Sequence, residues 1–309
     1  MDALMTLAEA NSPTLASAVA AIDKARATEA SARAGLFPSL TGSGSIERSG
    51  TNGSEESKVA VSNTTSGGLD ASWEIDLFGK TRAQVSADRA RVEEQVADWH
   101  DARVSLAAEI ADDYVQYRAC RLLEQTYREE LKSQRETISA TQTSATSGFT
   151  SGSDLALARA SAASSSSTLT SQQAECEVLV KTLTELAATD ETEVRKILGT
   201  QTGHIPTLRH IKVDSVPADL LRQRPDVAGL EREMAATLYE IGYAKADLYP
   251  SLSLSGDLTI NHSTLTGTGI PWSFGPSLSI PLFDGGSRRA AVNSAEAAYR
   301  SAVASYKSG

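Results

Sequence analysis

One stretch of this chain constrains its fold more than any other, because about 68 residues pass without a helix breaker. From Gly79 to about Ser147 there is no proline, and no glycine follows the opening turn. At ~1.5 Å per residue, a helix of that length would span about 100 Å. The glycine-bearing turn SGFTSGSD at 147–154 follows, and a second helix is predicted from Ser153 to about Ala188. Helices this long are typical of coiled coils rather than of ordinary globular domains.

Both predicted helices carry the 4-3 spacing of inward positions that a coiled coil requires. In the first helix these positions are Val92, Val96, Trp99, Leu106, Ile110, Tyr117, Cys120, Tyr127, Leu131 and Ile138. The same seam includes the polar residues Arg103, Asp113, Glu124 and Gln134. In the second helix they are Leu155, Ala158, Ala162, Ser165, Leu169, Gln172, Cys176, Leu179, Leu183 and Leu186. A plain helical hairpin in a globular bundle is the alternative interpretation, and the helix length counts against it.

The chain also contains an internal repeat that is much longer than a solenoid unit. Residues 12–46 and 224–258 each place a proline 25 residues before a Pro-Ser-Leu sequence. Residues 73–85 and 278–292 then match through Leu-Phe, a glycine turn and Arg-Ala. Each unit begins with a predicted helix of about 22 residues, which has its first proline in the first turn. We therefore interpret the chain as a tandem duplication.

Two alternating runs follow the first helix of each unit, and they predict two β-hairpins with strands of ~10 residues. One face of each run is apolar, and the other carries Ser, Gly, Asp and Thr. The apolar positions of the first unit are Leu36, Pro38, Leu40 and Ile46, then Leu69, Ala71, Trp73, Ile75 and Leu77. Those of the second unit are Leu252, Leu254, Leu258 and Ile260, then Trp272, Phe274, Leu278, Ile280 and Leu282.

The predicted fold class is mixed α and β, with one long coiled-coil hairpin and two β-hairpins. The expected segments are a helix at 1–36, a β-hairpin at 37–78, the long helical hairpin at 79–188, a connection at 189–223, a helix at 224–248, a β-hairpin at 249–284 and a shortened helix at 285–309. The polar, glycine-bearing segment from Ser49 to Ser66 is expected to be a loop between strands.

Composition narrows the possible functions. The chain has 309 residues, 40% of them hydrophobic, and a net charge of −10 with its basic residues mixed among acids, so nucleic-acid binding is not expected. No stretch approaches the ~18 to 20 apolar residues of a membrane-spanning helix, so any span must be made by strands. The N-terminus has no basic region followed by an apolar one, so no secretory signal is expected. Both ends fall inside helical patterns, as in a trimmed fragment.

No catalytic or metal-binding constellation is evident, so we expect neither an enzyme nor a cofactor. The histidines are His100, His204, His210 and His262, and their spacing fits no metal motif. The run SGFTSGSD lacks the Gly-Lys-Ser/Thr of a phosphate-binding loop. The sequence FDGG at 283–286 is best explained as a turn between a strand and a helix.

The two cysteines are positioned symmetrically about the predicted turn. Cys120 lies 28 residues before Gly148, and Cys176 lies 28 residues after it. In an antiparallel hairpin both would lie at the same height on the inward seams, within the Cα distance that a disulfide needs. Two buried free thiols are the alternative. A disulfide would indicate an oxidising compartment such as the periplasm.

At this point the residues resemble a known family. The sequence RQRPDVAGLEREMAATLYEIGYAKADLYPSLSLSG, then FGPSLSIPLFDGGSRRAAV, is similar to the signature of the TolC/NodT-like outer-membrane efflux family, nearest its lipoprotein branch. LFPSLTGSGS, WEIDLFGKTRAQV and SGFTSGSDLALARA agree in the first half. The resemblance implies a homotrimer in which three chains close a 12-stranded β-barrel in the outer membrane, continued by a helical tunnel across the periplasm. It also implies docking on a periplasmic adaptor and an inner-membrane pump.

Independent physical arguments agree with this resemblance. Four strands per chain cannot close a barrel, and an open sheet edge is not viable in lipid, so association is required. The residues expected to face outer-membrane lipid are Leu252, Leu254, Leu258, Ile260, Trp272 and Phe274. The turn expected to meet the adaptor comprises Gly148, Phe149, Thr150, Ser151, Gly152, Ser153 and Asp154. The alternative for that turn is a solvated turn with Asp154 at a helix N-terminus.

The chain departs from the family pattern in two places. The family's second long hairpin and lipidated N-terminal cysteine have no counterpart here, so a truncated chain without the tunnel-closing residues is expected. The favoured function is a passive export duct in the outer membrane, and its cargo could be a drug, a metal or a signalling oligosaccharide. The alternative is a structural coiled-coil or adhesin-like interaction protein whose strands pack as a soluble sandwich.

Overall fold

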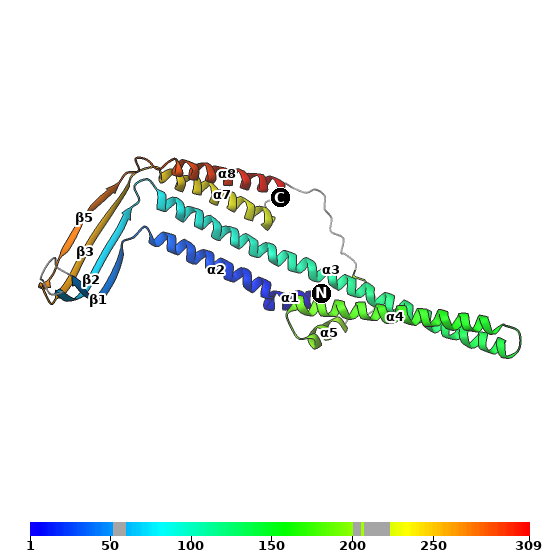
Figure 1. The fold of residues 1–309 in the computed structure, drawn as a ribbon. Coiled ribbons are helices and arrows are strands. Elements are labelled where there is room, and N and C mark those ends of the chain that lie inside the picture. Colours follow the sequence, from blue (N-terminus) through cyan, green and yellow to red (C-terminus); the bar gives the residue numbers. More distant parts are fainter. Residues whose placement is uncertain (52–59, 200–204, 207–222) are drawn as a thin grey trace. The chain divides into compact units, whose positions relative to one another are not determined.

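A computed structural model describes residues 1–51, 60–199, 205–206 and 223–309 (Figure 1). In chain order the elements are α1 (Asp2–Asn11), α2 (Pro13–Ala34), β1 (Ser39–Thr51), β2 (Ala60–Ile75), α3 (Lys80–Thr146), α4 (Gly152–Ala187), α5 (Glu191–Gly199), α7 (Pro225–Ala246), β3 (Ser251–Ser263), β4 (Gly267–Gly269), β5 (Trp272–Ser279) and α8 (Ser287–Ser308). The chain forms two compact units. Unit 1 holds Met1–Val19 and Trp99–Ala218, and unit 2 holds Ala20–Asp98 and Asp219–Gly309.

The helices begin and end close to where the sequence predicts. Helix α3 has 67 residues and α4 has 36, with the turn between them where the glycines stand. Helices α2 and α7 each have 22 residues and begin at a proline, whose fixed φ and missing N–H suit a first turn. The segment 1–36 holds two helices rather than one, because Ser12 precedes Pro13 and takes an extended ψ of 121° that ends α1.

The structure differs from the sequence-based expectation in two connecting segments. The segment 49–66 was expected to be a loop, but β1 continues to Thr51 and β2 begins at Ala60, so most of its described residues pair in the sheet. Alternating Ser and Thr suit a strand with one polar face, which explains the error. The connection expected at 189–223 begins with helix α5, and its residues 200–204 and 207–222 lie outside the described part of the chain.

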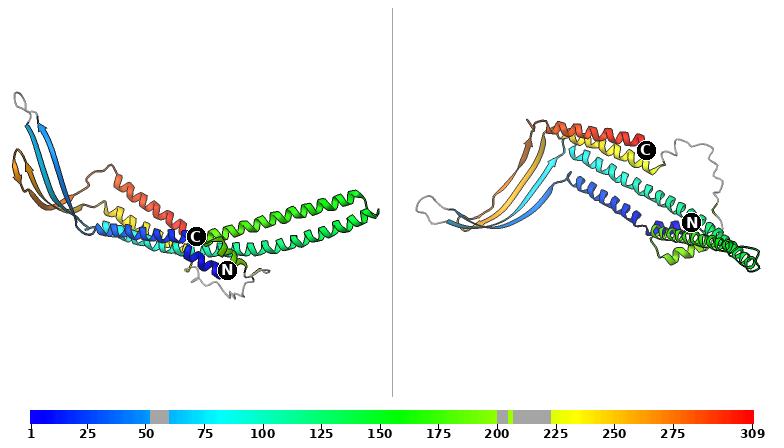
Figure 2. Two further views of the ribbon diagram at one scale, coloured as in Figure 1. Left: turned by 90° about the horizontal axis from the view of Figure 1, so that it is seen from below. Right: turned by 45° about the vertical axis from the view of Figure 1, so that its right-hand side comes forward.

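The strands form one antiparallel sheet in unit 2 (Figures 1 and 2). The order is β1–β2–β3–β5, and the short β4 pairs with the end of β3. The two hairpins of the repeat are joined by β2 and β3, where Leu69 pairs with Leu258 and Trp73 with Leu254. The two halves of the internal repeat therefore share a single sheet.

The buried apolar core of unit 1 lies where α1, the start of α2, α4 and α5 meet the middle of α3. Its members are Leu4, Ala8, Leu15, Leu106, Ile110, Tyr114, Val180, Leu183, Ala187, Val194 and Leu198. The predicted seam of α4 is confirmed, because each of its ten positions is buried or half-buried. The α3 seam is confirmed at Leu106, Ile110, Cys120 and Leu131, which are buried. None of the helices in the described ranges has the length and apolarity to cross a membrane.

Candidate membrane surface and helical tip

The sheet has one apolar face, and the strand register defines it. Leu252 pairs with Leu278 and with Ile75, and Leu258 pairs with Trp272 and with Leu69. Directly paired residues point to the same side of a sheet, so this side is apolar across the strands. The large apolar residues on it are Leu40, Ile46, Leu69, Trp73, Ile75, Leu252, Leu254, Leu258, Ile260, Trp272, Phe274 and Leu278. The six residues expected to face lipid therefore share one face.

Most of this apolar face is open to solvent in the single chain. Trp272 is 73% exposed and Phe274 is 70% exposed, and both lie on the edge strand β5. A contiguous apolar surface of this kind marks a contact with lipid or with another protein. A soluble sandwich would need a second layer over this face, and no described element of unit 2 buries it.

The opposite face of the sheet is polar. It carries Ser, Thr, Asn and Asp at almost every position, and hydroxyl pairs link neighbouring strands: Ser39 with Ser72 and Ser45 with Ser66, both at 2.8 Å. Asp70 stands directly opposite Asp257, whose carboxylate accepts a hydrogen bond from Ser273. Like charges placed opposite one another disfavour a sheet packed in a dry core, so this face suits contact with water.

Two equivalent turns connect the sheet to the helices of unit 2. Gly79 and Gly286 precede α3 and α8 with φ values of +77° and +90°, which favour glycine. Asp284 accepts hydrogen bonds from the backbone N–H groups of Gly286 and Arg288 at 2.9 and 3.0 Å. The sequence FDGG is therefore the strand-to-helix turn that was predicted.

An ion-pair cluster fixes the helix ends beside these turns. Asp247, after α7, accepts hydrogen bonds from Lys80 of α3 and from Arg288 of α8, the latter at 3.1 Å. The Lys80 ammonium and then the Arg288 guanidinium lower the pKa of Asp247. Phe78 stacks on Tyr249 with ring centroids 4.8 Å apart. Sequence reasoning missed this cluster, because its charged members are far apart in the chain.

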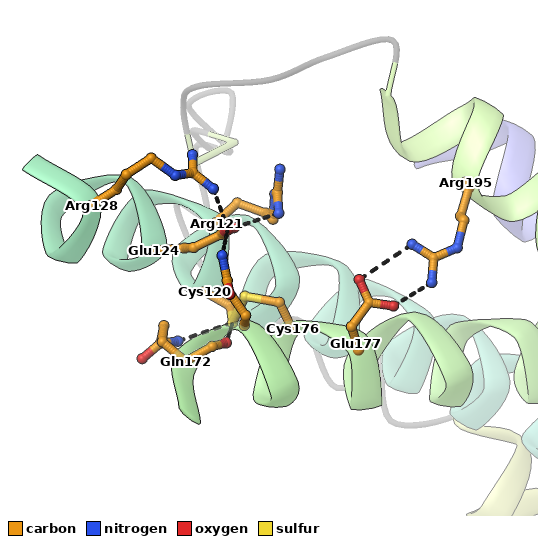
Figure 3. The surroundings of a disulfide bond; sticks show 9 residues. Cys120, Arg121, Glu124, Arg128, Gln172, Cys176, Glu177 and Arg195 are labelled. Atoms are coloured by element: carbon orange, nitrogen blue, oxygen red, sulfur yellow. Dashed lines mark hydrogen bonds and ion pairs between the residues drawn. A yellow bond between two sulfur atoms is a disulfide. The ribbon is translucent and has the colours of Figure 1, made fainter. Parts of the chain in front are cut away.

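The helical hairpin of unit 1 contains the cysteine pair (Figure 3). A disulfide joins Cys120 to Cys176 across α3 and α4, with their Cα atoms 5.7 Å apart. Gln172 donates a hydrogen bond to Cys120 Sγ at 3.0 Å. The buried carboxylate of Glu124 accepts hydrogen bonds from Gln173 of the facing helix, at 3.1 Å, and from Arg121 and Arg128.

Buried polar residues lie both on the predicted seam of α3, at Glu124, and beside it. Arg118 is also buried, and it donates to the Tyr114 hydroxyl at 2.8 Å. Tyr114 and Arg118 lie outside the predicted seam, whereas Glu124 is one of its polar positions. Every buried charged group in this hairpin therefore has a partner, as burial of charge requires.

The turn between α3 and α4 is ordered by its own side chains. Ser151 Oγ accepts from Asp154 N–H, and Asp154 Oδ2 accepts from Ser151 N–H, both at 3.2 Å, which is a capping box for α4. The hydroxyls of Thr150 and Ser144 lie 2.5 Å apart. Phe149 projects into solvent and is 87% exposed. Gly148 has φ +82°, and Gly152 and Ser153 begin α4.

A second cluster that sequence reasoning missed lies between α3 and α7 in unit 2. Burial first, then the carboxylates of Glu233 and Asp98, raise the pKa of Glu94 to about 7. A Cβ added at Gly229 would come within 3.0 Å of Asp98 Oδ1, so the glycine allows this close approach. The described residues hold no group of three or more His, Cys, Asp or Glu side chains that could bind a metal ion.

The comparisons with known proteins decide the family. The sequence matches the outer membrane efflux protein family over residues 4–189 and 216–309. The chain belongs to this family. It is 31% identical over 283 residues to Nodulation protein T of Rhizobium leguminosarum bv. trifolii, covering 90% of this chain and 60% of that protein. It is 30% identical to the toluene efflux pump outer membrane protein TtgC of Pseudomonas putida, covering 88% of this chain and 57% of that protein.

A solved structure supports the same assignment. The outer-membrane channel OprN matches with a TM-score of 0.84 and 31% identity, over 99% of this chain and 70% of that chain. The resemblance seen in the sequence and the expected mixed α and β fold class are therefore confirmed. The chain spans about 60% or less of the length of the two curated relatives named above.

Proposed function

We propose that this chain forms part of the wall of a passive export duct in the outer membrane, with its helices in the periplasm and no enzymatic activity. The two-faced sheet carries this proposal, because one side is apolar and exposed while the other is hydroxyl-rich and acidic. The relatives are named as an outer membrane protein of a toluene efflux pump and as an outer-membrane channel. In a duct the apolar side meets lipid and the polar side meets the water-filled lumen.

The assembly in this proposal is a homotrimer. Strands β1 and β5 form the two outer edges of the sheet, and neither has a partner on its outer side within the described residues. Open strand edges are unstable in lipid. Pairing β5 of one chain with β1 of the next removes every edge once the ring closes, and three chains supply 12 long strands.

The partners in this proposal are a periplasmic adaptor and an inner-membrane pump. The turn Gly148–Asp154 is the adaptor contact, and the fully projecting Phe149 supports this role. A capped, ordered turn presents its side chains without a large ordering cost on binding.

The test is membrane partitioning of the expressed chain. A duct component is extracted from outer-membrane fractions only by detergent, migrates as a trimer and gives ion conductance in liposomes. The alternative, a structural coiled-coil or adhesin-like protein, predicts a soluble chain without conductance. Recovery of a stable soluble monomer without detergent would contradict the duct proposal.

A further inference from the structure

One charged side chain stands on the apolar side of the sheet. Arg48 of β1 lies two residues beyond Ile46, which pairs with Thr65 of β2 and through it shares a row with His262 of β3. Alternate residues of a strand point to the same side, so Arg48 shares the apolar side with Ile46. No Asp, Glu, Lys or other Arg stands on that side within the described strands. Arg48 is exposed, and no described residue forms an ion pair with it.

The strand geometry places Arg48 at one boundary of the apolar band. Helices α2 and α7 lead into the starts of β1 and β3, so Arg48 and His262 stand toward the strand ends that lie away from these helices (Figure 1). On β2 the apolar side runs from Ile75 to Thr65, which is about 34 Å along the strand at ~3.4 Å per residue. At the ~40° tilt of barrel strands this becomes a height of roughly 26 Å, close to the ~25 Å apolar band of such barrels. Arg48 belongs to the next row, and it therefore lies where lipid headgroups begin.

An apolar groove of about 490 Å³ lies below this row, on the same side of the sheet. Its lining residues with this orientation are Thr65, Gly67, Leu69, Leu258, Ile260 and His262. Gly67 makes the depression, because it has no side chain and pairs with Gly44 of β1 as well as with Ile260. A Cβ added at Gly67 would meet no atom closer than 3.9 Å, so the space above it is open. The groove thus has apolar walls and a polar end beside the row of Arg48.

These features match the three parts of a phosphorylated glycolipid. A guanidinium binds phosphate through parallel N–H donors, and the Arg48 stem can follow the apolar surface while its charge reaches the headgroup. His262 Nδ1 shares a hydrogen bond with Thr268 Oγ1 at 2.9 Å, which orients the ring at the end of the groove. The exposed Thr65 hydroxyl and the imidazole suit sugar hydroxyl groups, which both donate and accept hydrogen bonds. The apolar walls suit an acyl chain.

We propose that this surface binds a phosphorylated glycolipid of the outer leaflet. Its phosphate contacts Arg48, its sugar contacts Thr65 and His262, and one acyl chain lies in the groove over Gly67. The inference rests on the proposed duct function, because it requires the apolar side of the sheet to face lipid. It adds a site for one class of lipid to that side.

The experiment measures binding of lipid A, a bisphosphorylated and acylated disaccharide, to the chain in phosphatidylcholine nanodiscs. Native mass spectrometry of the released protein counts the bound lipid. We expect Arg48→Gln to weaken binding by about tenfold, as the loss of one charge-assisted hydrogen bond predicts, and Arg48→Lys to weaken it less. Gly67→Leu fills the groove and should also weaken binding. The matched controls are Arg135→Gln, which removes an exposed arginine of α3 in unit 1, and Gly275→Leu, which adds the same side chain on the polar side of β5; both should bind lipid A as wild type does.

The outcomes separate this inference from the function on which it rests. Trimer yield and conductance of each variant show that it has inserted. Unchanged lipid A binding in both Arg48→Gln and Gly67→Leu overturns the site. Wild-type binding of phosphatidylglycerol as tight as that of lipid A overturns the assignment to a glycolipid. Either result in a preparation of conducting trimers leaves the duct proposal intact, whereas a chain that neither inserts nor conducts overturns both proposals.

Discussion

The stability of the α3–α7 contact should depend on pH through Glu94. Burial and the two carboxylates of Glu233 and Asp98 raise its pKa to about 7 from 4.5, while Arg91 opposes the shift. The folded protein therefore holds a proton at pH values where the unfolded chain has lost it. The stabilisation is fully present below pH 4.5, and it is lost as the pH rises through about 7.

The size of the effect follows from the shift and from the exposure of the side chain. A difference of about 2.5 pKa units corresponds to roughly 3.4 kcal/mol. Glu94 is half-buried, so solvent screens its neighbours and the full amount does not apply. We expect the local free energy of opening to fall by about 1–2 kcal/mol between pH 4.5 and pH 8.

Glu94→Gln tests this directly, because it keeps the shape of the side chain and removes the titration. Hydrogen exchange of the α7 amides, corrected for intrinsic rates at each pH, measures local opening. Wild type should lose protection as the pH rises, and the variant should hold it and be the more stable of the two at pH 8. Glu231→Gln, an exposed change on α7, is the control and should keep the wild-type slope. A Glu94→Gln variant with the same slope as wild type would refute the reasoning.

Three further predictions concern the hairpin, the sheet and the tip. The unreduced protein should resist alkylation at Cys120 and Cys176 in mass spectrometry, and replacing both by Ser should cost up to about 4 kcal/mol of stability in the chain-entropy estimate. Two alkylated thiols before reduction would contradict the bond. Leu254→Arg should destabilise the membrane-inserted chain by ~2 to 4 kcal/mol if residue 254 lies at mid-bilayer, and it should reduce membrane insertion. Ser255→Arg, on the polar face, should insert normally. Equal insertion of the two variants would contradict the assignment of the lipid-facing side. Phe149→Glu should abolish efflux in a complete channel at normal trimer yield. Persistent efflux would contradict the adaptor contact and indicate that the tip is only a solvated turn.

A substitution at Phe149 tests the adaptor contact more directly than a substitution at Gly148 or Ser151. Substituting Gly148 strains a residue at φ +82°, and substituting Ser151 removes the capping box of α4. Either change would disturb the turn itself, so lost efflux would be ambiguous. Phe149 is 87% exposed, and its replacement changes the surface while the capping contacts stay in place.

Much of the fold could be predicted because local signals and long-range contacts agree. The absence of Pro and Gly predicts the length of α3, and period-two alternation predicts which face of the sheet is apolar. The two cysteines could be placed together because residues that are equally far from the turn lie opposite one another in an antiparallel helical hairpin. The missed features are polar contacts between distant segments. Glu94 and Glu233 stand 139 residues apart, and nothing local marks either as one of a pair.

The two halves of the internal repeat differ in the contacts that their equivalent helices make. Within the chain, the sheet joins α3 and α7 permanently, so charged pairs such as Arg91 with Glu240 can form between fixed partners. The equivalent helices α8 and α2 make different contacts. Glu296 of α8 pairs with Lys245 of α7 at 3.4 Å, while Thr28 of α2 stands where α7 has Glu240. The duplication therefore keeps the order of helices and strands in each repeat, while the charged contacts between the helices have diverged.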